Sequence, residues 1–435
     1  MTNAPSPTMP AEDRVEYRRR FETARAVMRA AGLDALVIGS GPAQLLPVDD
    51  MSLGAHGKLA QPRYHRWFSG FHIWGAESVS PQPVVVVLPL EGEPSLVVRP
   101  GTLRTWITLA RAHTWIDRIV STYHDDPEWE ARTNWGLSAN DLAADVARAI
   151  EDSGLAAARI GIVGGWPGFH DTLAALPKAS FESTLTMDAA GNPIDMLWEL
   201  VATNSAWEIG RLERAQASAD DAMRAFMTTA QDGVPIAHAL SAARAITTRD
   251  GSDDTLFEIT CGTDPWALWI APNQPPGACY RTGSLVTLGL MNSVDGYWIQ
   301  MPRTWMIGGP NPAQQRVFDA AKRSLDAMLA RLEPGVTGGQ LWDAGLAEIH
   351  GAGFEPRGRL GHSVGFTGVT GPERFSLLPG NNEPLEDGVA FVLHPCVWDK
   401  STGIAAQLGD SLVMEDGRWR FLSPDPVSYA TSFDQ

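Results

Sequence analysis

The sequence predicts a mixed α/β fold, α+β in its second part, that is organised as two domains. Three observations support this prediction. Short β-branched runs alternate with helical stretches, several helical stretches carry cap signals, and the pattern changes near residue 200 to paired helices followed by longer strands. We therefore expect one domain over 1–195, with roughly the first 12 residues flexible because they are rich in Pro, Ala and Ser, and a second domain over 196–435.

The first domain is expected to begin with a helix over 12–31. Apolar residues recur there at helical spacing, and Gly32 suits the position that follows a helix end. The sequence EGEP at 91–94 predicts the turn of a hairpin. Further elements are expected as strands at 34–39, 83–90, 95–98 and 159–165, and as a polar, alanine-rich helix at 139–153.

The second domain is expected to begin with a long amphipathic helix. Ser205 and Glu208 form a capping-box pattern, and Asp232-Gly233 ends the apolar periodicity. Asn311-Pro312 is a second helix start, with an N-cap residue followed by proline. The remaining expected elements are helices at 235–248, from 312 to about 332 and from 337 to about 353, strands at 255–261, 284–291 and 296–305, and a β-hairpin over 385–421.

Composition narrows the function. The chain has 34 Lys+Arg against 51 Asp+Glu, which gives a formal charge of −17, and it contains no Lys/Arg-rich block. This argues against nucleic acid or an anionic membrane as the partner. Three cysteines favour a reducing compartment, and no apolar signal segment opens the chain. We expect a cytoplasmic protein with a small-molecule substrate. The 16 tryptophans include candidates for apolar or cation-binding pocket walls.

Five segments resemble, in the right order, elements of the creatinase/prolidase/methionine aminopeptidase family, which has the pita-bread fold. They are WEIGRLERAQASADDA (207–222), GYWIQMPRTWMIG (296–308), LEPGVTGGQLWDAGL (332–346), LGHSVGF (360–366) and the closing hairpin PLEDGVAFVLHP with GDSLVMEDG (384–395, 409–417). Residues 12–180 resemble the N-terminal creatinase-type domain. The resemblance implies a creatinase-type α/β domain followed by a pita-bread catalytic domain, and a homodimer.

Metallopeptidases of this family hold two metal ions with two aspartates, one histidine and two glutamates. The resemblance places only His362 unchanged among these positions. The other positions are held by Thr287 or Gly289, by Gln300, by His394, and by Gln407 or Gly409. Because divalent ions need anionic ligands to offset their charge, we expect no binuclear metal site and no cofactor. The alternative is a single divalent ion held by His362 and His394 with Asp410 or Glu258.

Three residues are the candidate catalytic group. His362 is the proton-transfer residue, since imidazole titrates near neutral pH. His394 would share acid and base roles with it, and Asp410 would orient one of the two rings. The alternatives are core histidines and a turn aspartate. Cys261 and Cys396 are weaker candidates as nucleophiles, the alternative being small buried apolar side chains.

The candidate substrate-binding residues come from segments that line the cavity in the resembled fold. Gln300 can donate and accept hydrogen bonds, the tryptophans offer ring faces, and the carboxylates offer charge. For each of them the alternative is ordinary packing or a surface position. The candidates are Gln300, Glu258, Trp266, Trp269, Trp298, Glu373 and, in the first domain, His65.

The resemblance favours a metal-independent enzyme, similar to creatinase or ectoine hydrolase, that hydrolyses a C–N bond in a small polar or cationic substrate. Three alternatives remain open. RTWMIG (303–308) also resembles the dimethylsulfoniopropionate lyase branch, which implies an elimination. A divergent X-Pro metallopeptidase would keep the reaction of the larger family. A non-catalytic binding module would keep the fold alone.

Overall fold

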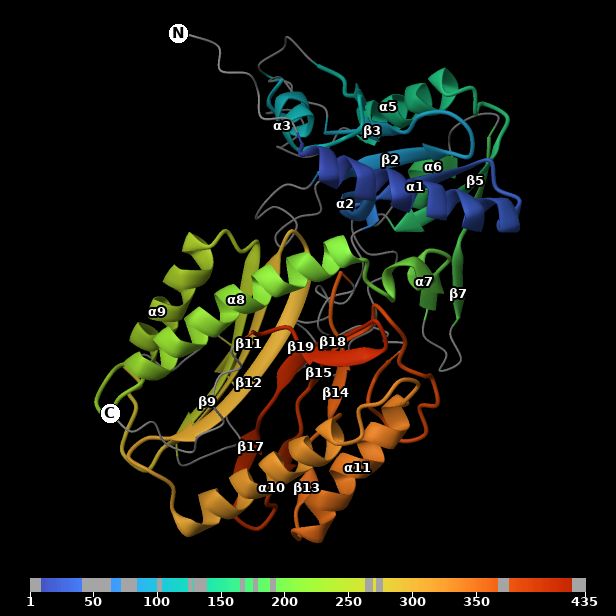
Figure 1. The fold of residues 1–435 in the computed structure, drawn as a ribbon. Helices are drawn as coiled ribbons and strands as arrows, with labels where there is room; N and C mark the ends of the chain where they lie inside the picture. The colour runs from blue at the N-terminus through green and yellow to red at the C-terminus, as the bar shows by residue number, and fades with distance from the viewer. Residues whose placement is uncertain are drawn as a thin grey trace. The chain divides into compact units, whose positions relative to one another are not determined.

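The computed structural model describes residues 9–40, 64–71, 84–99, 104–123, 128, 139–164, 169–174, 179–187, 193–262, 269–270, 277–366 and 375–424. The chain divides into two compact units, Met1–Val201 and Ala202–Gln435 (Figure 1). This division lies a few residues after the boundary expected at 195/196. In the described residues, no helix combines the length and the apolar character that crossing a membrane requires.

The N-terminal unit is built on a mixed six-stranded sheet in the order β4-β3-β2-β1-β5-β6. The expected hairpin is confirmed, because β2 and β3 pair antiparallel across the EGEP turn. The strands are β1 (Ala35–Gly39), β2 (Val85–Pro89), β3 (Ser95–Val97), β4 (Arg118–Val120), β5 (Arg159–Gly164) and β6 (Ser180–Ser183), with a separate pair β7 (Leu185–Met187) and β8 (Pro193–Asp195).

Helices complete this unit. α1 (Ala11–Ala31) starts one residue before the expected helix and ends, as expected, at Gly32, which adopts φ +67°. The amides of Gly32 and Leu33 donate hydrogen bonds to carbonyl oxygens of the last helical turn. Glycine avoids the strain that a side chain would cause at this backbone conformation. The other helices are α2 (Tyr64–Ser69), α3 (Thr105–His113), α5 (Ala139–Asp152), α6 (Phe169–Ala174) and α7 (Trp198–Val201).

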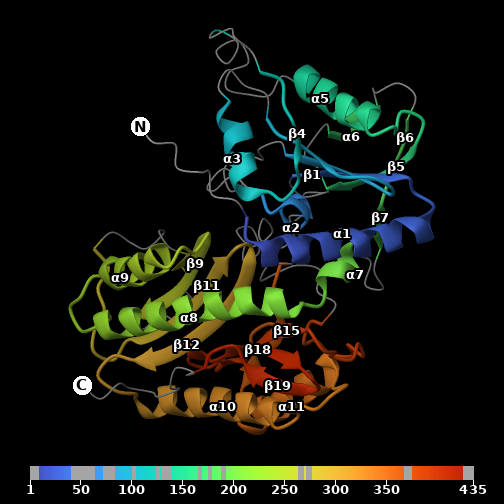
Figure 2. The ribbon, with the colours of Figure 1, turned by 45° about the horizontal axis from the view of Figure 1, so that its top comes forward.

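The C-terminal unit begins with two helices that lie side by side, α8 (Ala206–Thr229) and α9 (Ile236–Arg249) (Figures 1 and 2). The capping box is confirmed: the Ser205 hydroxyl accepts from the Glu208 amide, and the Glu208 carboxylate accepts from the Ser205 amide. α8 packs on an antiparallel sheet in the order β10-β9-β11-β12. Its strands are β9 (Asp254–Gly262), β10 (Trp269–Ile270), β11 (Leu285–Val294) and β12 (Tyr297–Met306).

The second half of this unit has two further capped helices, α10 (Pro312–Leu329) and α11 (Gly338–Gly351), with Asn311 and Thr337 as N-caps. They lie beside two small antiparallel sheets, β14-β15-β18-β19 and β13-β16-β17 (Figure 1). The strands are β13 (Glu355–Pro356), β14 (Gly361–Ser363), β15 (Ala390–Leu393), β16 (Cys396–Trp398), β17 (Ala405–Gln407), β18 (Asp410–Glu415) and β19 (Arg418–Phe421).

The expected hairpin over 385–421 is divided between these two sheets. β15 pairs with β18 in one sheet, and β16 pairs with β17 in the other. One arm changes sheet at His394-Pro395, where proline supplies no amide hydrogen for a ladder, and the other arm changes at Leu408-Gly409. His394 therefore lies at a corner of the chain and not within a continuous strand.

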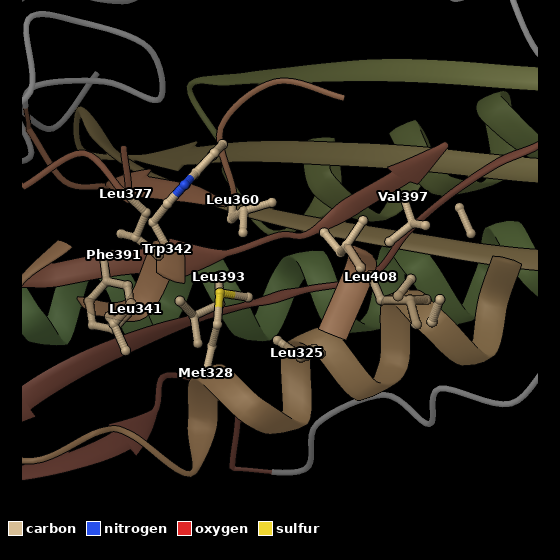
Figure 3. Packing of buried hydrophobic residues seen from close by; sticks show 14 of the residues in the cluster. Leu325, Met328, Leu341, Trp342, Leu360, Leu377, Phe391, Leu393, Val397 and Leu408 are labelled. Atoms are coloured by element: carbon tan, nitrogen blue, oxygen red, sulfur yellow. The ribbon is translucent and has the colours of Figure 1, made fainter. Parts of the chain in front are cut away.

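An apolar core beneath the two small sheets holds this corner in place. Leu393 is fully buried against α10 and α11, and Leu360, two residues before His362, belongs to the same cluster (Figure 3). Each fully buried leucine contributes about 1.5–3 kcal/mol relative to exposure. The core members drawn with labels are Leu325, Met328, Leu341, Trp342, Leu360, Leu377, Phe391, Leu393, Val397 and Leu408.

Candidate active site

Two histidines from neighbouring segments lie together in the C-terminal unit. The ring centroids of His362 and His394 are 4.9 Å apart and the rings are inclined at 64°. Both side chains are buried, with 1% and 5% exposed. His362 belongs to β14, and His394 follows β15, the strand that pairs with β14. We call this pair the two-histidine site.

The proton on His362 is fixed by its backbone neighbour. Its Nδ1 atom lies 2.9 Å from the carbonyl oxygen of Ser363. A carbonyl oxygen only accepts hydrogen bonds, so Nδ1 carries the hydrogen and, in the neutral ring, Nε2 carries the lone pair. Nε2 is therefore the basic atom of His362.

His394 has the opposite arrangement. The amide Nε2 of Gln407, on β17, lies 3.3 Å from Nδ1 of His394. Because an amide nitrogen donates, Nδ1 of His394 accepts and the ring hydrogen lies on Nε2. Burial, together with the nearby positive charge of Arg359, lowers the pKa of His394 from 6.5 to about 3. His394 is thus a neutral hydrogen-bond donor at physiological pH.

Two glycines allow the backbones around the histidines to approach closely. A Cβ atom at Gly361, which precedes His362, would collide with the carbonyl oxygen of Val392. A Cβ atom at Gly409 would collide with the carbonyl oxygen of Leu393, which precedes His394. Larger residues at either position would push the histidine-bearing segments apart.

One face of the β9-β11-β12 sheet carries two of the candidate substrate-binding residues. Trp298 and Gln300 share this face, since side chains alternate along a strand. Gln300 is 4% exposed, and its backbone amide and carbonyl both contact the Ser411 hydroxyl. Ser411 pairs with Val392, which in turn pairs with His362. Two strands, β18 and β15, thus connect Gln300 to His362.

Asp410 requires a correction. We expected its carboxylate to orient one of the histidines, but the structure places it in an ion pair with Arg303, 2.7 Å from Nη2, with both side chains 1% exposed. Arg303 also donates to the carbonyls of Pro302 and Gly409. The Nδ1 atoms of the histidines are held instead by Ser363 and Gln407. Asp410 is thus a structural residue that joins β12 to β18.

The other candidates are placed as follows. Glu258 is half-buried on β9, and Trp298 is 5% exposed with its amide donating to the Gly365 carbonyl. His65 is buried in α2 of the N-terminal unit. Trp269 contributes backbone to β10. Trp266 and Glu373 lie outside the described residues. Their roles stay predictions.

Neither candidate cysteine is set up as a nucleophile. Burial raises the pKa of Cys261 and of Cys396 to about 11. Both thiols are therefore protonated at neutral pH, whereas a nucleophilic cysteine needs its thiolate. Cys261 also lies one residue out of phase with Glu258 and Thr260, on the face of β9 opposite to the site.

Sequence reasoning missed the residues that orient the histidines. Gln407 was noted only as the place of a lost ligand, and Ser363 acts through its backbone, which no side-chain pattern records. Arg303 stands in the RT dipeptide of the central strand, but its partner is distant in the sequence. Of these three residues, only Gln407 could have been found from the sequence, because the family resemblance places it beside the histidines.

The lowered pKa of His394 makes stability depend on pH. Below pH ~6.5 the unfolded chain binds a proton at this residue, whereas the folded chain does so only near pH 3, so acid favours unfolding. From about pH 8 to about pH 5 this residue should cost the wild-type protein about 2 kcal/mol. His394→Asn, whose Oδ1 can still accept from Gln407, should remove that part of the dependence. Urea unfolding at both pH values measures it.

The control is His350→Asn on α11, where the histidine side chain is 53% exposed. This variant should keep the wild-type pH dependence. If wild type and His394→Asn lost equal stability on acidification, His394 would not be a buried neutral imidazole in the folded protein.

Comparisons with known proteins agree with this architecture. Residues 210–416 match the family model for metallopeptidase family M24. The chain is 24% identical over 426 residues to the agropine synthesis cyclase of Rhizobium rhizogenes, covering 94% of this chain and 96% of that protein. It is 24% identical over 265 residues to the uncharacterized peptidase YqhT of Bacillus subtilis (strain 168), covering 60% of this chain and 73% of that protein.

Solved structures extend the likeness to the whole chain. A recombinant prolidase from Thermococcus sibiricus superposes with a TM-score of 0.68 at 16% identity, covering 94% of this chain and 97% of that one. The Xaa-Pro dipeptidase from Bacillus anthracis gives a TM-score of 0.68 at 15% identity, covering 95% and 99%. At these identities the likeness establishes the fold, so the prediction of an α/β protein with a pita-bread domain is confirmed.

The residues of the site do not fit the two metal ions of a metallopeptidase. The five ligand positions carry Thr287 or Gly289, Gln300, His362, His394, and Gln407 or Gly409, none of which is anionic. The carboxylate nearest to them in sequence, Asp410, is engaged by Arg303. Across the described residues, no group of three or more His, Cys, Asp or Glu could hold a metal ion. Amides and imidazoles alone do not offset two divalent charges.

Proposed function

We propose that the chain, whose residues 210–416 match the family model for metallopeptidase family M24, is an enzyme that hydrolyses a C–N bond in a small polar substrate without a metal centre. The observation that carries the proposal is the two-histidine site. Two buried imidazoles stand at positions where the family places metal ligands, and their Nδ1 atoms have opposite roles, donating to a carbonyl in His362 and accepting from an amide in His394. One ring thus offers a base and the other offers a donor.

In this proposal, Nε2 of His362 takes a proton from a water molecule as the water oxygen attacks the substrate carbon. Nε2–H of His394 donates a hydrogen bond to the substrate atom on which negative charge develops. The C–N bond then breaks, and the proton held by His362 passes to the leaving nitrogen. The water is consumed and the proton is conserved. His394 acts as a neutral donor throughout, because its lowered pKa keeps it from becoming imidazolium.

A second candidate reaction is ring closure. The relative that covers nearly all of both chains is named as a cyclase. The same base would then remove a proton from a hydroxyl or amine within the substrate, this internal group would attack a carboxyl carbon of the same molecule, and the carboxyl hydroxyl would take up the proton and leave as water. An elimination needs the same base and gives an unsaturated product. The three reactions differ in mass: hydrolysis adds one water, cyclisation expels one, and elimination splits the substrate without adding water.

The first test is a panel of small amides, amidines, guanidines, lactams and lactones incubated with the full-length protein and followed by mass spectrometry. We expect turnover of at least one compound after removal of metals by chelator. Loss of the activity on chelation would contradict a metal-independent reaction. Absence of turnover across all classes would favour a binding module.

A second prediction concerns the rival metallopeptidase. Protein purified without added metal should contain less than one divalent ion per chain, and added Mn²⁺ should not produce cleavage of Ala-Pro or Met-Pro, because the ligand positions lack carboxylates. Elemental analysis and a proline-release assay measure this, with the Thermococcus sibiricus prolidase as the positive control. Two bound ions per chain together with Mn²⁺-stimulated cleavage would replace our proposal by the metallopeptidase.

The proposal also includes a homodimer, as the resemblance implies, in a reducing cellular compartment. Light scattering of the purified chain measures the assembly.

A further inference from the structure

One hydroxyl from the central sheet holds the backbone of Gln407. β17 is the terminal strand of the sheet β13-β16-β17, so a backbone group on its outer edge cannot pair with a further strand of that sheet. At Gln407 a threonine of β12 takes that place. Oγ1 of Thr304 donates to the Gln407 carbonyl oxygen at 2.9 Å and accepts from the Gln407 amide at 2.9 Å. A hydroxyl is at once donor and acceptor, so this single atom satisfies both backbone groups of the residue.

A second threonine orients that hydroxyl. Thr287 on β11 lies directly opposite Thr304, and their Oγ1 atoms are 2.8 Å apart. A hydroxyl carries one hydrogen, and that of Thr304 is used by the Gln407 carbonyl, which can only accept. The hydrogen between the two threonines therefore belongs to Thr287. Because Thr304 is 2% exposed, bulk water has little access to these bonds.

The side chain of Gln407 is held by a single histidine. Its Nε2 atom lies 3.3 Å from Nδ1 of His394 and 3.5 Å from the His394 carbonyl oxygen. An amide nitrogen has two hydrogens, so each acceptor can take one of them. The reversed amide would bring Oε1 against the carbonyl oxygen, and two acceptors would then face each other. The amide nitrogen is therefore the atom that faces His394.

These two sets of hydrogen bonds meet in one residue. Thr304 holds the backbone of Gln407, and the Gln407 side chain holds the ring of His394. Without the Thr304 hydroxyl, an N–H and a C=O group of β17 would lose their partner, which favours a shift of this edge strand. Such a shift would move the amide away from Nδ1. The position of the ring hydrogen on His394 thus depends on a hydroxyl that lies on another sheet.

We propose that Thr304, oriented by Thr287, is a positioning residue of the two-histidine site, because it holds Gln407 where the Gln407 amide keeps the ring hydrogen of His394 on Nε2. The effect on the ring rests on the hydrogen bonds alone. The effect on catalysis rests on the proposed function, in which this ring hydrogen is donated to the developing negative charge. Thr304 acts there through Gln407 and His394.

The test follows the ring hydrogen of His394 directly. Thr304→Val keeps the shape of the side chain, suits a strand and removes the hydroxyl. ¹⁵N NMR of the full-length protein should show the hydrogen on Nε2 alone in wild type and on both ring nitrogens in Thr304→Val. Thr304→Ser keeps the hydroxyl and should restore the wild-type spectrum. The control is Thr247→Val on α9, at a threonine that is 1% exposed and donates to the Arg244 carbonyl. It should keep the wild-type tautomer.

Further variants separate positioning from a general loss of packing. Gln407→Leu removes the amide and should give the same mixture of tautomers as Thr304→Val. The double variant should add no further change, because both substitutions remove one contact to His394. Thr287→Val leaves the bonds between Thr304 and Gln407 in place and should shift the tautomer less. Circular dichroism verifies the fold, and Thr304→Cys, whose thiol is a weak donor, should give an intermediate mixture if Thr304→Val does not fold.

Kinetics on the compound that the panel identifies give the second readout. Thr304→Val should lower kcat by about 10–100-fold with little change in KM, and Thr304→Ser should retain wild-type kcat. A wild-type tautomer in folded Thr304→Val and Gln407→Leu would overturn the positioning and leave the proposed reaction standing. An equal shift in Thr304→Ser or in Thr247→Val would also overturn it. A displaced ring hydrogen with unchanged kcat would instead support the positioning and contradict the role of His394 in the proposed reaction.

Discussion

His362→Asn is expected to lower kcat/KM by about 10²–10⁴-fold on the compound that the panel identifies, because it removes the base. Asparagine places an amide nitrogen near the position of Nδ1, so the hydrogen bond to the Ser363 carbonyl can persist. It offers no titrating atom in place of Nε2. The substitution therefore separates proton transfer from the structural role of the ring.

Steady-state kinetics of purified variants measure this effect. His350→Asn on α11 is the matched control and should retain wild-type kcat/KM, since its side chain is exposed on the outer helix. His394→Asn is expected to show a smaller loss, because it removes a hydrogen bond to the developing charge and leaves the base in place. A His362→Asn variant with more than about one tenth of wild-type kcat/KM would show that His362 is not the base.

The arrangement of the rings also has a direct spectroscopic consequence. ¹⁵N NMR of the full-length protein should show His362 with its hydrogen on Nδ1 and His394 with its hydrogen on Nε2. The His394 signal should not change between neutral pH and about pH 5, because its pKa is lowered to about 3. Identical tautomers in the two rings would remove the division into base and donor.

Local rules predicted the frame of the C-terminal unit well. The capping boxes at Ser205, Asn311 and Thr337 are all formed, because the cap residue and its partner three positions later lie within one helical turn. The meeting of His362 and His394 followed from the order of the resembled motifs. It is confirmed by their ring distance.

The partners of those histidines could not be predicted in the same way. Gln407 reaches His394 because the closing hairpin changes sheet on both arms, and this depends on the register of two sheets and not on any local pattern. We expected Asp410 to orient a histidine because a carboxylate near a candidate histidine suggests a catalytic triad. In the structure its partner is instead Arg303, a buried arginine on another strand.

That buried ion pair gives the largest expected effect on stability. Arg303 and Asp410 are both 1% exposed, and Arg303 also holds the carbonyls of Pro302 and Gly409. Asp220 on α8 belongs to the same region: burial raises its pKa, and the negative charge of Asp410 raises it further. Arg303 is therefore the cation that pairs with the buried carboxylate of Asp410.

Arg303→Met should lower the free energy of unfolding by about 3–5 kcal/mol, since it leaves the buried carboxylate of Asp410 without its cation. Asp410→Asn should cost less, because the asparagine oxygen can still accept a hydrogen bond from Arg303. The double variant should be more stable than the sum of the two losses predicts, because the charge that each single variant leaves uncompensated is then gone. Urea denaturation of the four proteins completes the cycle.

The same cycle reports on the site. Gly409 lies two residues after Gln407, and Pro302 lies two residues after Gln300. Loss of the Arg303 contacts should therefore weaken the positioning of both amides, including the Gln407 amide that donates to His394. We expect Asp410→Asn to keep kcat within about tenfold of wild type, which distinguishes a positioning residue from the third member of a catalytic triad, whose loss costs about 10⁴-fold. If Asp410→Asn lowered kcat by about 10⁴-fold while the free energy of unfolding changed little, Asp410 would belong to the catalytic group. The Nδ1 partners of both histidines would then have to change during the reaction.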